Sequence, residues 1–225
     1  MALILHAHPL SSCCWKVLIA LYEQGTPFEQ RMVNLGDADA RRGFEALWPT
    51  AKIPLLEDDG AVVPETSIIV EHLEIHHPGP KPLLPIDEPV RLRARLWDRL
   101  FDLYVMTPMQ RFIAELLRSE GERHVRTQQE ALAALASAYD LIEARLGADP
   151  WAAGADFTIA DCAAAPALFY AAIVQPFPPS HATLSGYFDR LMDRPSVRRV
   201  IAEARPWFSY FPLVGDIPQR FLADS

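Results

Sequence analysis

Cysteine is scarce in this sequence, with three thiols in 225 residues. The count is odd, and Cys13 and Cys14 are adjacent in the chain, where a disulfide between them would be strained. We therefore expect no disulfide framework. Reduced thiols of this kind are usual in cytoplasmic proteins.

Positive charge and long apolar runs are lacking as well. Lysine and arginine number 21 against 29 aspartates and glutamates, a formal net charge of −8, which argues against nucleic acid as a partner. No run approaches the roughly 20 apolar residues of a membrane span. Residues 1–8 lack the basic start and the cleavage site of a signal peptide. We expect a globular protein of the cytoplasm with no membrane contact.

The first 80 residues alternate short apolar runs with helical patterns, which predicts strands joined by helices. Strands are expected at residues 2–7 and 28–34, and a hairpin at residues 53–57 and 61–63. A helix capped by a serine should follow the first strand and end at Gly25, and further helices are expected at residues 40–47 and 66–76.

Proline is dense between residues 77 and 89, where five prolines interrupt any helical period. This pattern predicts a domain of residues 1–80, a linker of residues 81–89 and a domain of residues 90–225. Helical patterns at residues 90–120 and 123–146, without a strand signal as far as residue 204, predict that the second domain is all-helical. The aromatic tail at residues 206–225 is expected to pack against these helices.

Three segments of the first domain carry groups suited to an anionic ligand. Residues 11–17 lie where a strand gives way to a helix, so hydroxyls, thiols and free backbone N–H groups meet there and can stabilise a thiolate. Residues 52–54, Lys-Ile-Pro, open a strand, and a cis proline would turn the backbone of Ile53 outward. Residues 65–66, Glu-Thr, open another helix. Taken alone, each segment also has a purely structural interpretation as a helix cap or an ordinary proline.

Together the segments resemble the soluble glutathione transferase family. Residues 11–21, SSCCWKVLIAL, are similar to the active-site helix of serine-type members and come closest to the zeta class, the maleylacetoacetate isomerases. Residues 52–54 match the family's cis-proline turn, and residues 64–73, PETSIIVEHL, its Glu/Gln-Ser segment. Residues 157–161, FTIAD, resemble its helix-capping motif, in which Thr158 and Asp161 have the spacing of a capping box. The resemblance implies a thioredoxin-like α/β domain followed by an all-α domain.

The resemblance also implies glutathione as the co-substrate. Ser11 corresponds to the hydroxyl that donates to the glutathione sulfur, and Ser12 and Cys13 are further catalytic candidates beside it. The glutathione contacts fall on Leu10, on Lys52 for the glycyl carboxylate, on Ile53 and Pro54 for the cysteinyl backbone, and on Glu65 and Thr66 for the γ-glutamyl end.

A small electrophile is expected as the second substrate, in the cleft between the domains. Its candidate contacts are His8, Pro9, Tyr104, Pro108 and Arg111. The family further implies a homodimer. Two alternatives remain open: a maleylacetoacetate-type cis-trans isomerase, in which glutathione adds and leaves again, and a binding protein that keeps the pocket without turnover.

No metal site is expected from the sequence. His72 and His76 are four residues apart on a predicted helix, but the glutamate between them is one position late for a zinc-protease motif, and the sequence offers no evident third ligand. A thiol–disulfide role of Cys13 or Cys14 lacks the second cysteine of a Cys-x-x-Cys pair, so external glutathione would have to resolve the mixed disulfide.

Overall fold

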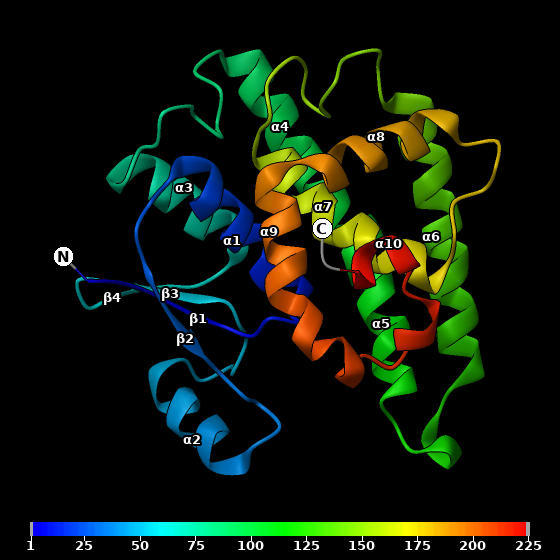
Figure 1. Ribbon diagram of the computed structural model, residues 1–225, viewed down its shortest axis with the longest axis horizontal. Helices are drawn as coiled ribbons and strands as arrows, with labels where there is room; N and C mark the ends of the chain where they lie inside the picture. Colours follow the sequence, from blue (N-terminus) through cyan, green and yellow to red (C-terminus); the bar gives the residue numbers. More distant parts are fainter. Residues whose placement is uncertain (1, 224–225) are drawn as a thin grey trace.

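The computed structural model describes residues 2–223, so residue 1 of the predicted first domain and residues 224–225 of the predicted tail lie outside the described part. Figure 1 shows a small sheet with its helices beside a larger group of helices. The first part consists of β1 (Leu3–Ala7), α1 (Ser12–Gln24), β2 (Glu29–Met32), α2 (Ala38–Leu47), β3 (Leu55–Asp58), β4 (Ala61–Val63) and α3 (Thr66–His76). The predicted α/β part followed by a helical part is confirmed.

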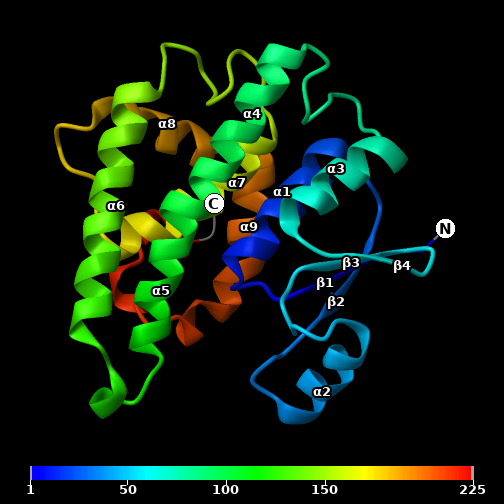
Figure 2. The ribbon, with the colours of Figure 1, turned by 180° about the vertical axis from the view of Figure 1, so that it is seen from behind.

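The sheet has four strands in the order β2-β1-β3-β4. β1 pairs with β2 in parallel and with β3 antiparallel, and β4 completes the β3 hairpin. Side chains alternate along β1: Leu5 joins the core formed with α1 and α3, while His6 lies against Phe44 of α2. Figures 1 and 2 show α1 and α3 on one face of the sheet and α2 on the other.

β3 begins at Leu55, two residues after the predicted start of that strand. Pro54 has no N–H to donate to a neighbouring strand, so regular pairing starts only at the next residue. Residues 77–87 then lead from α3 to α4 without helix or strand, and we propose that this segment connects two domains.

Within the described chain, the helical part contains seven further α-helices, one π-helical segment and three short 3-10 helices. They are α4 (Glu88–Leu100), η1 (Phe101–Met106), α5 (Thr107–Leu116), η2 (Glu120–Glu122), α6 (Val125–Arg145), α7 (Ile159–Val174), α8 (Ala182–Asp193), α9 (Pro195–Ala204), η3 (Arg205–Tyr210), η4 (Val214–Asp216) and α10 (Gln219–Leu222). α7 is buried along nearly its whole length and forms the centre of this part. In the described chain, no helix combines the length and the hydropathy that a membrane crossing requires.

The single helix expected over residues 90–120 is interrupted by a π-helical segment, η1, and ends at Leu116. Within this segment the N–H of Thr107 donates to the carbonyl of Asp102, five residues earlier, and the Thr107 hydroxyl donates to the same oxygen at 2.9 Å. Pro108 follows directly. Since proline lacks an N–H and crowds the carbonyl four residues before it, a widened turn accommodates it.

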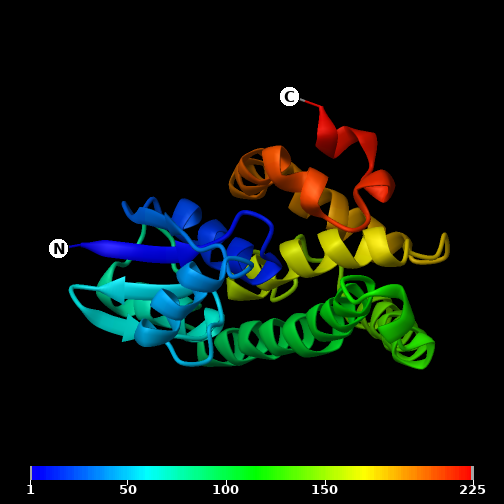
Figure 3. The same ribbon diagram turned by 90° about the horizontal axis from the view of Figure 1, so that it is seen from below.

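The sheet part and the helical part share one hydrophobic core, and Figure 3 shows them side by side. Trp15 of α1 packs on Phe169 and Tyr170 of α7, with ring centroids 4.9 and 5.1 Å away. The tail lies against the helices through buried aromatic residues such as Phe208 and Phe221, as predicted for its described residues. The helix that carries Ser11 at its start is therefore fixed against the helical part.

Candidate functional site

Ser11 is the N-cap of α1, at the point where the chain turns out of the sheet. Its backbone is extended, with φ −76° and ψ 113°, and its Oγ accepts a hydrogen bond from the N–H of Cys14 at 3.3 Å. The cap uses a lone pair of the hydroxyl oxygen and leaves the hydroxyl proton for another acceptor. Because the N-terminus of a helix carries partial positive charge, an anion beside Ser11 is favoured.

The loop that precedes Ser11 is held by side chains from two helices. The indole N–H of Trp15 donates to the Pro9 carbonyl at 2.6 Å. The hydroxyl of Tyr170, which comes from α7, donates to the Leu10 carbonyl at 3.0 Å. Both carbonyls are thus turned inward and satisfied, so the position of the Ser11 hydroxyl is set before any ligand arrives.

Ser12 and Cys13 lie next to Ser11 and contact the helical part. The side-chain amide of Gln110, on α5, donates to Ser12 Oγ at 3.2 Å and to Cys13 Sγ at 3.3 Å. Burial raises the pKa of the Cys13 thiol, and it raises the pKa of Cys14 to about 12. Both thiols are free but protonated at neutral pH, so neither is an activated nucleophile.

The two other predicted segments also have the geometry of a binding surface. The Ile53–Pro54 peptide bond is cis, as the resemblance implied; Pro54 is buried and Lys52 is exposed. Glu65 has φ 68° at the start of α3, a conformation that costs free energy for a residue with a side chain and that is found preferentially at functional sites. The Glu65 side chain does not cap α3, so the first N–H groups beyond Thr66 are open to a ligand.

A buried ionic cluster connects α1 with the start of α3. Lys16 of α1 lies 2.5 Å from Asp98 and 2.8 Å from Asp102, and its ammonium donates to the Ser67 hydroxyl at 2.9 Å. Lys16 is almost completely buried. Burial also raises the pKa of the Asp102 carboxyl. Since Ser67 belongs to the first turn of α3, the cluster fixes the start of α3 relative to α1 and to the long helix formed by α4, η1 and α5.

The residues predicted to bind the second substrate fall in two places. His8 lies on the loop before Ser11 and is half-buried, with its ring centroid 5.3 Å from that of Trp207 in the tail, and burial lowers its pKa. Tyr104, Pro108 and Arg111 instead line a pocket of about 400 Å³ between η1, α5 and α6, and none of residues 8–13 contributes to it.

The helical period explains this separation. Spacings of four and three residues put Tyr104, Pro108 and Arg111 on one face of the helix, whereas Gln110 projects from another face. The sequence groups the first three correctly as a set but does not reveal which face is turned toward Ser11. Gln110 is the residue that reaches the Ser11 region, and no pattern in the sequence singles it out.

Both parts of the chain match models of known protein families. The family model described as the glutathione S-transferase N-terminal domain matches residues 5–81, and the model for the corresponding C-terminal domain matches residues 122–203. A probable maleylacetoacetate isomerase from Caenorhabditis elegans is 31% identical over 170 residues, which cover 75% of this chain and 78% of the relative.

Solved structures agree with these matches. A glutathione S-transferase from Methylobacterium radiotolerans, solved in complex with glutathione sulfonate, is 30% identical with a TM-score of 0.77 over 89% of this chain and 94% of its own. Poplar glutathione transferase F1 reaches a TM-score of 0.81 at 19% identity, over 92% and 99% of the two chains, a likeness that concerns the fold.

Proposed function

The chain belongs to the glutathione S-transferase family and is a glutathione transferase, and from this premise we propose how its site activates glutathione. The Ser11 hydroxyl donates a hydrogen bond to the glutathione sulfur, and the N–H groups at the start of α1 further stabilise the thiolate. The observation that carries this proposal is the N-cap geometry, which engages Ser11 Oγ as an acceptor and leaves its proton to donate. The resulting thiolate attacks a small electrophile and forms a thioether.

In this proposal glutathione binds across the segment before β3 and the start of α3. The backbone of Ile53 pairs with the cysteinyl unit, and the exposed Lys52 ammonium attracts the glycyl carboxylate. Glu65 and Thr66 hold the γ-glutamyl end, whose carboxylate meets the start of α3 and whose ammonium meets the Glu65 carboxylate. The strained backbone of Glu65 and the uncapped first turn of α3 support this assignment. Leu10 and Pro54 complete the surface by contact.

Serine, rather than cysteine, is the group that acts on the sulfur. Burial raises the pKa of Cys13 and Cys14 and keeps both in their thiol forms, and the side-chain amide of Gln110 donates a hydrogen bond to Cys13 Sγ. Ser12 is buried and shares the same amide, so its hydroxyl has less freedom to turn toward a ligand. A thiol–disulfide exchange function finds no support in these thiols.

The second substrate is proposed to lie between the loop at His8 and Pro9 and the long helix. A neutral His8 beside Trp207 offers an apolar, aromatic wall, and Gln110 offers an amide that can orient a polar group. The pocket of Tyr104, Pro108 and Arg111 is the alternative place for this substrate.

Isomerisation is the second candidate activity, since several relatives are named maleylacetoacetate isomerases. In that reaction the same thiolate would add to a cis double bond, allow rotation about the resulting single bond and leave again. Product analysis separates the two activities, because an isomerase regenerates glutathione and a transferase consumes it.

A homodimer in the cytoplasm is part of the proposal. Large apolar side chains on α3, α4 and η1 are more than half exposed within the described chain: Ile68, Ile75, Leu92, Leu96, Leu103 and Tyr104. An apolar surface of this kind is typical of a face that binds a second protein surface. A second copy of the chain is the expected occupant.

Steady-state conjugation of chlorodinitrobenzene tests the role of Ser11 through the matched changes Ser11→Ala and Ser12→Ala. Because a hydrogen bond to a charged group contributes about 1.5–3 kcal/mol, Ser11→Ala is expected to lower kcat by about 10- to 100-fold with little change in KM for glutathione. A loss in Ser12→Ala alone would transfer the role to Ser12. Wild-type protein that binds glutathione without conjugating or isomerising any substrate would be a binding protein instead.

A further inference from the structure

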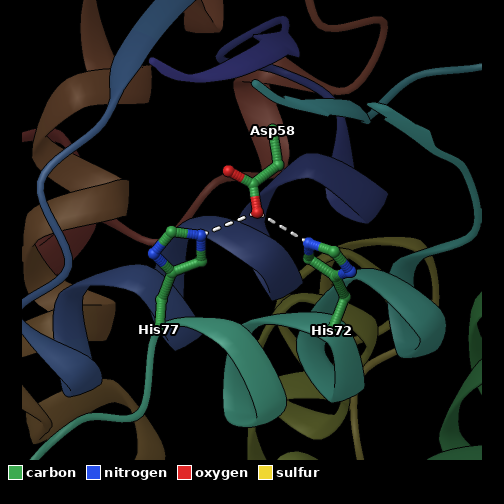
Figure 4. A group of neighbouring side chains, drawn as sticks. All are labelled: Asp58, His72 and His77. Atoms are coloured by element: carbon green, nitrogen blue, oxygen red, sulfur yellow. Dashed lines mark hydrogen bonds and ion pairs between the residues drawn. The ribbon is translucent and has the colours of Figure 1, made fainter. Parts of the chain in front are cut away.

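Two histidines and one aspartate converge at the end of α3 that is remote from the glutathione site. His72 Nε2 lies 2.8 Å from Asp58 Oδ2, and His77 Nε2 lies 2.7 Å from the same oxygen. In Figure 4 the carboxylate points from the end of β3 between the two imidazole rings, which rise from α3 and from the residue that follows it. One potential ligand atom from each residue lies within 4.8 Å of the other two.

These three residues offer the donor set of a transition-metal site. Two imidazole nitrogens and a carboxylate oxygen bind Zn²⁺ in tetrahedral sites whose fourth position is taken by water. With metal–ligand bonds of about 2.0–2.2 Å, neighbouring ligand atoms in such a site are about 3.4 Å apart. The present nitrogen–oxygen distances of 2.7 and 2.8 Å would have to open by about 0.6 Å, which small rotations of the side chains achieve.

The electrostatic surroundings favour a cation. Residues 1–80 contain 5 lysines and arginines against 11 aspartates and glutamates, a net charge of −6. All three side chains are mostly but not entirely buried, with exposed fractions of 13–20%, so an ion can still enter from solvent.

We propose that Asp58, His72 and His77 form a binding site for a divalent transition-metal ion, with Zn²⁺ as the best match to the ligands. On binding, each Nε2 must be free of its proton: a doubly protonated imidazole releases one proton to solvent, and a neutral one changes to the tautomer protonated at Nδ1. The metal then replaces the two hydrogen bonds. The site is distinct from the glutathione site, since His72 and His77 follow Thr66 by six and eleven residues, which correspond to about 9 and 16 Å along the direction of α3.

The bound ion joins three segments of the chain. Asp58 ends β3, His72 lies in the last turns of α3, and His77 begins the segment that leads to α4. That segment is already packed on α1, because a Cβ added to Gly79 would lie 2.6 Å from the Gln24 Cα. The metal therefore stabilises the sheet part and fixes the direction in which the chain leaves it, without taking part in the chemistry at Ser11.

Calorimetric titration of untagged, chelator-treated, full-length protein with zinc chloride, in buffer free of glutathione, tests the site. One Zn²⁺ is expected per chain, and thermal unfolding should move to higher temperature with zinc. Because second-shell changes already cost 10- to 100-fold in metal affinity, Asp58→Asn and His77→Gln should each weaken binding by at least about tenfold and abolish the thermal response.

One further variant and the zinc-free form of Asp58→Asn provide the controls. His76→Gln removes an exposed imidazole that packs on the His72 ring, with centroids 4.3 Å apart, but that supplies no ligand, and this variant should bind zinc as the wild type does. Asp58→Asn keeps an oxygen that accepts both hydrogen bonds, so its zinc-free form should unfold close to the wild-type temperature, which separates metal loss from misfolding. The proposal is overturned if wild-type protein binds no zinc at micromolar concentration. Zinc binding of wild-type strength in Asp58→Asn also overturns the proposal. So does loss of zinc binding in Cys13→Ser while Asp58→Asn and His77→Gln still bind zinc.

Discussion

Asp161 is expected to hold the start of α7 and, through α7, the loop that carries Ser11. The predicted capping box is confirmed: the Thr158 side chain and the Asp161 carboxylate cap each other's backbone N–H groups. The carboxylate also accepts from the N–H of Ala152 at 3.0 Å and from the hydroxyl of Tyr187 at 2.6 Å, and it is completely buried. Burial raises the pKa of this carboxyl, while the hydrogen bonds stabilise its charged form.

Replacing Asp161 with alanine leaves several buried donors without an acceptor. A lost N-cap costs about 1 kcal/mol, and each buried donor left unsatisfied adds about 1–3 kcal/mol, although such contributions are not additive. We expect Asp161→Ala to lower the free energy of unfolding by about 3–5 kcal/mol and Tm by roughly 6–20 °C. Differential scanning calorimetry measures both.

Asp156→Ala is the matched control, since it removes the same charge from an exposed position a few residues away. It should change the free energy of unfolding by no more than about 0.5 kcal/mol. If Asp161→Ala melts within a degree or two of the wild type, Asp161 does not organise the start of α7 and the assignment of its hydrogen bonds is refuted.

Three other expectations concern charge and assembly. Burial would raise the pKa of Glu23, but its hydrogen bonds to Arg194 and a serine hold the pKa below the usual value. The stability that this carboxylate contributes is therefore present above the unfolded pKa of about 4.3 and is lost as the pH falls through the folded pKa. Between pH 6 and about pH 3.5, the urea midpoint should fall less in Glu23→Gln than in the wild type. Lys16→Ala removes the buried ammonium that lies 2.5 Å from Asp98 and leaves the half-exposed Arg99 as the ion-pair partner of this carboxylate. The free energy of unfolding in urea should fall by about 3 kcal/mol, and an unchanged midpoint would contradict this expectation. Sedimentation should show a wild-type dimer at micromolar concentration and a monomer for Leu96→Glu, and a wild-type monomer would contradict the proposed interface.

Features specified by neighbouring residues could be predicted from the sequence. Gly25 adopts φ 65° at the end of α1, where only a glycine is free of steric cost, and the turn at Asp59-Gly60 likewise has positive φ at both residues. The capping box needs only Thr158 and a carboxylate three residues later. In each case a short stretch of chain contains both the signal and the structure.

Features that depend on tertiary approach could not be predicted. Gln110 reaches Cys13 across 97 residues, and nothing in the pattern of the long helix indicates which face meets α1. The widened turn before Pro108 alters that pattern further, because a π segment shifts every later side chain around the axis. The sequence pairs His72 with His76, four residues on along one helix, whereas in the structure His72 lies beside His77 and beside Asp58, which comes from a strand.

The central claim is that the Ser11 hydroxyl stabilises the glutathione thiolate, and ultraviolet titration of bound glutathione tests it most directly. In the wild-type protein the thiol of bound glutathione should titrate below the ~8.5 of a free thiol. A hydrogen bond of about 1.5–3 kcal/mol to the charged sulfur corresponds to about one to two pKa units, so Ser11→Ala should raise the pKa of the bound thiol by that amount. The same pKa in both proteins, with glutathione bound to each, would contradict the account.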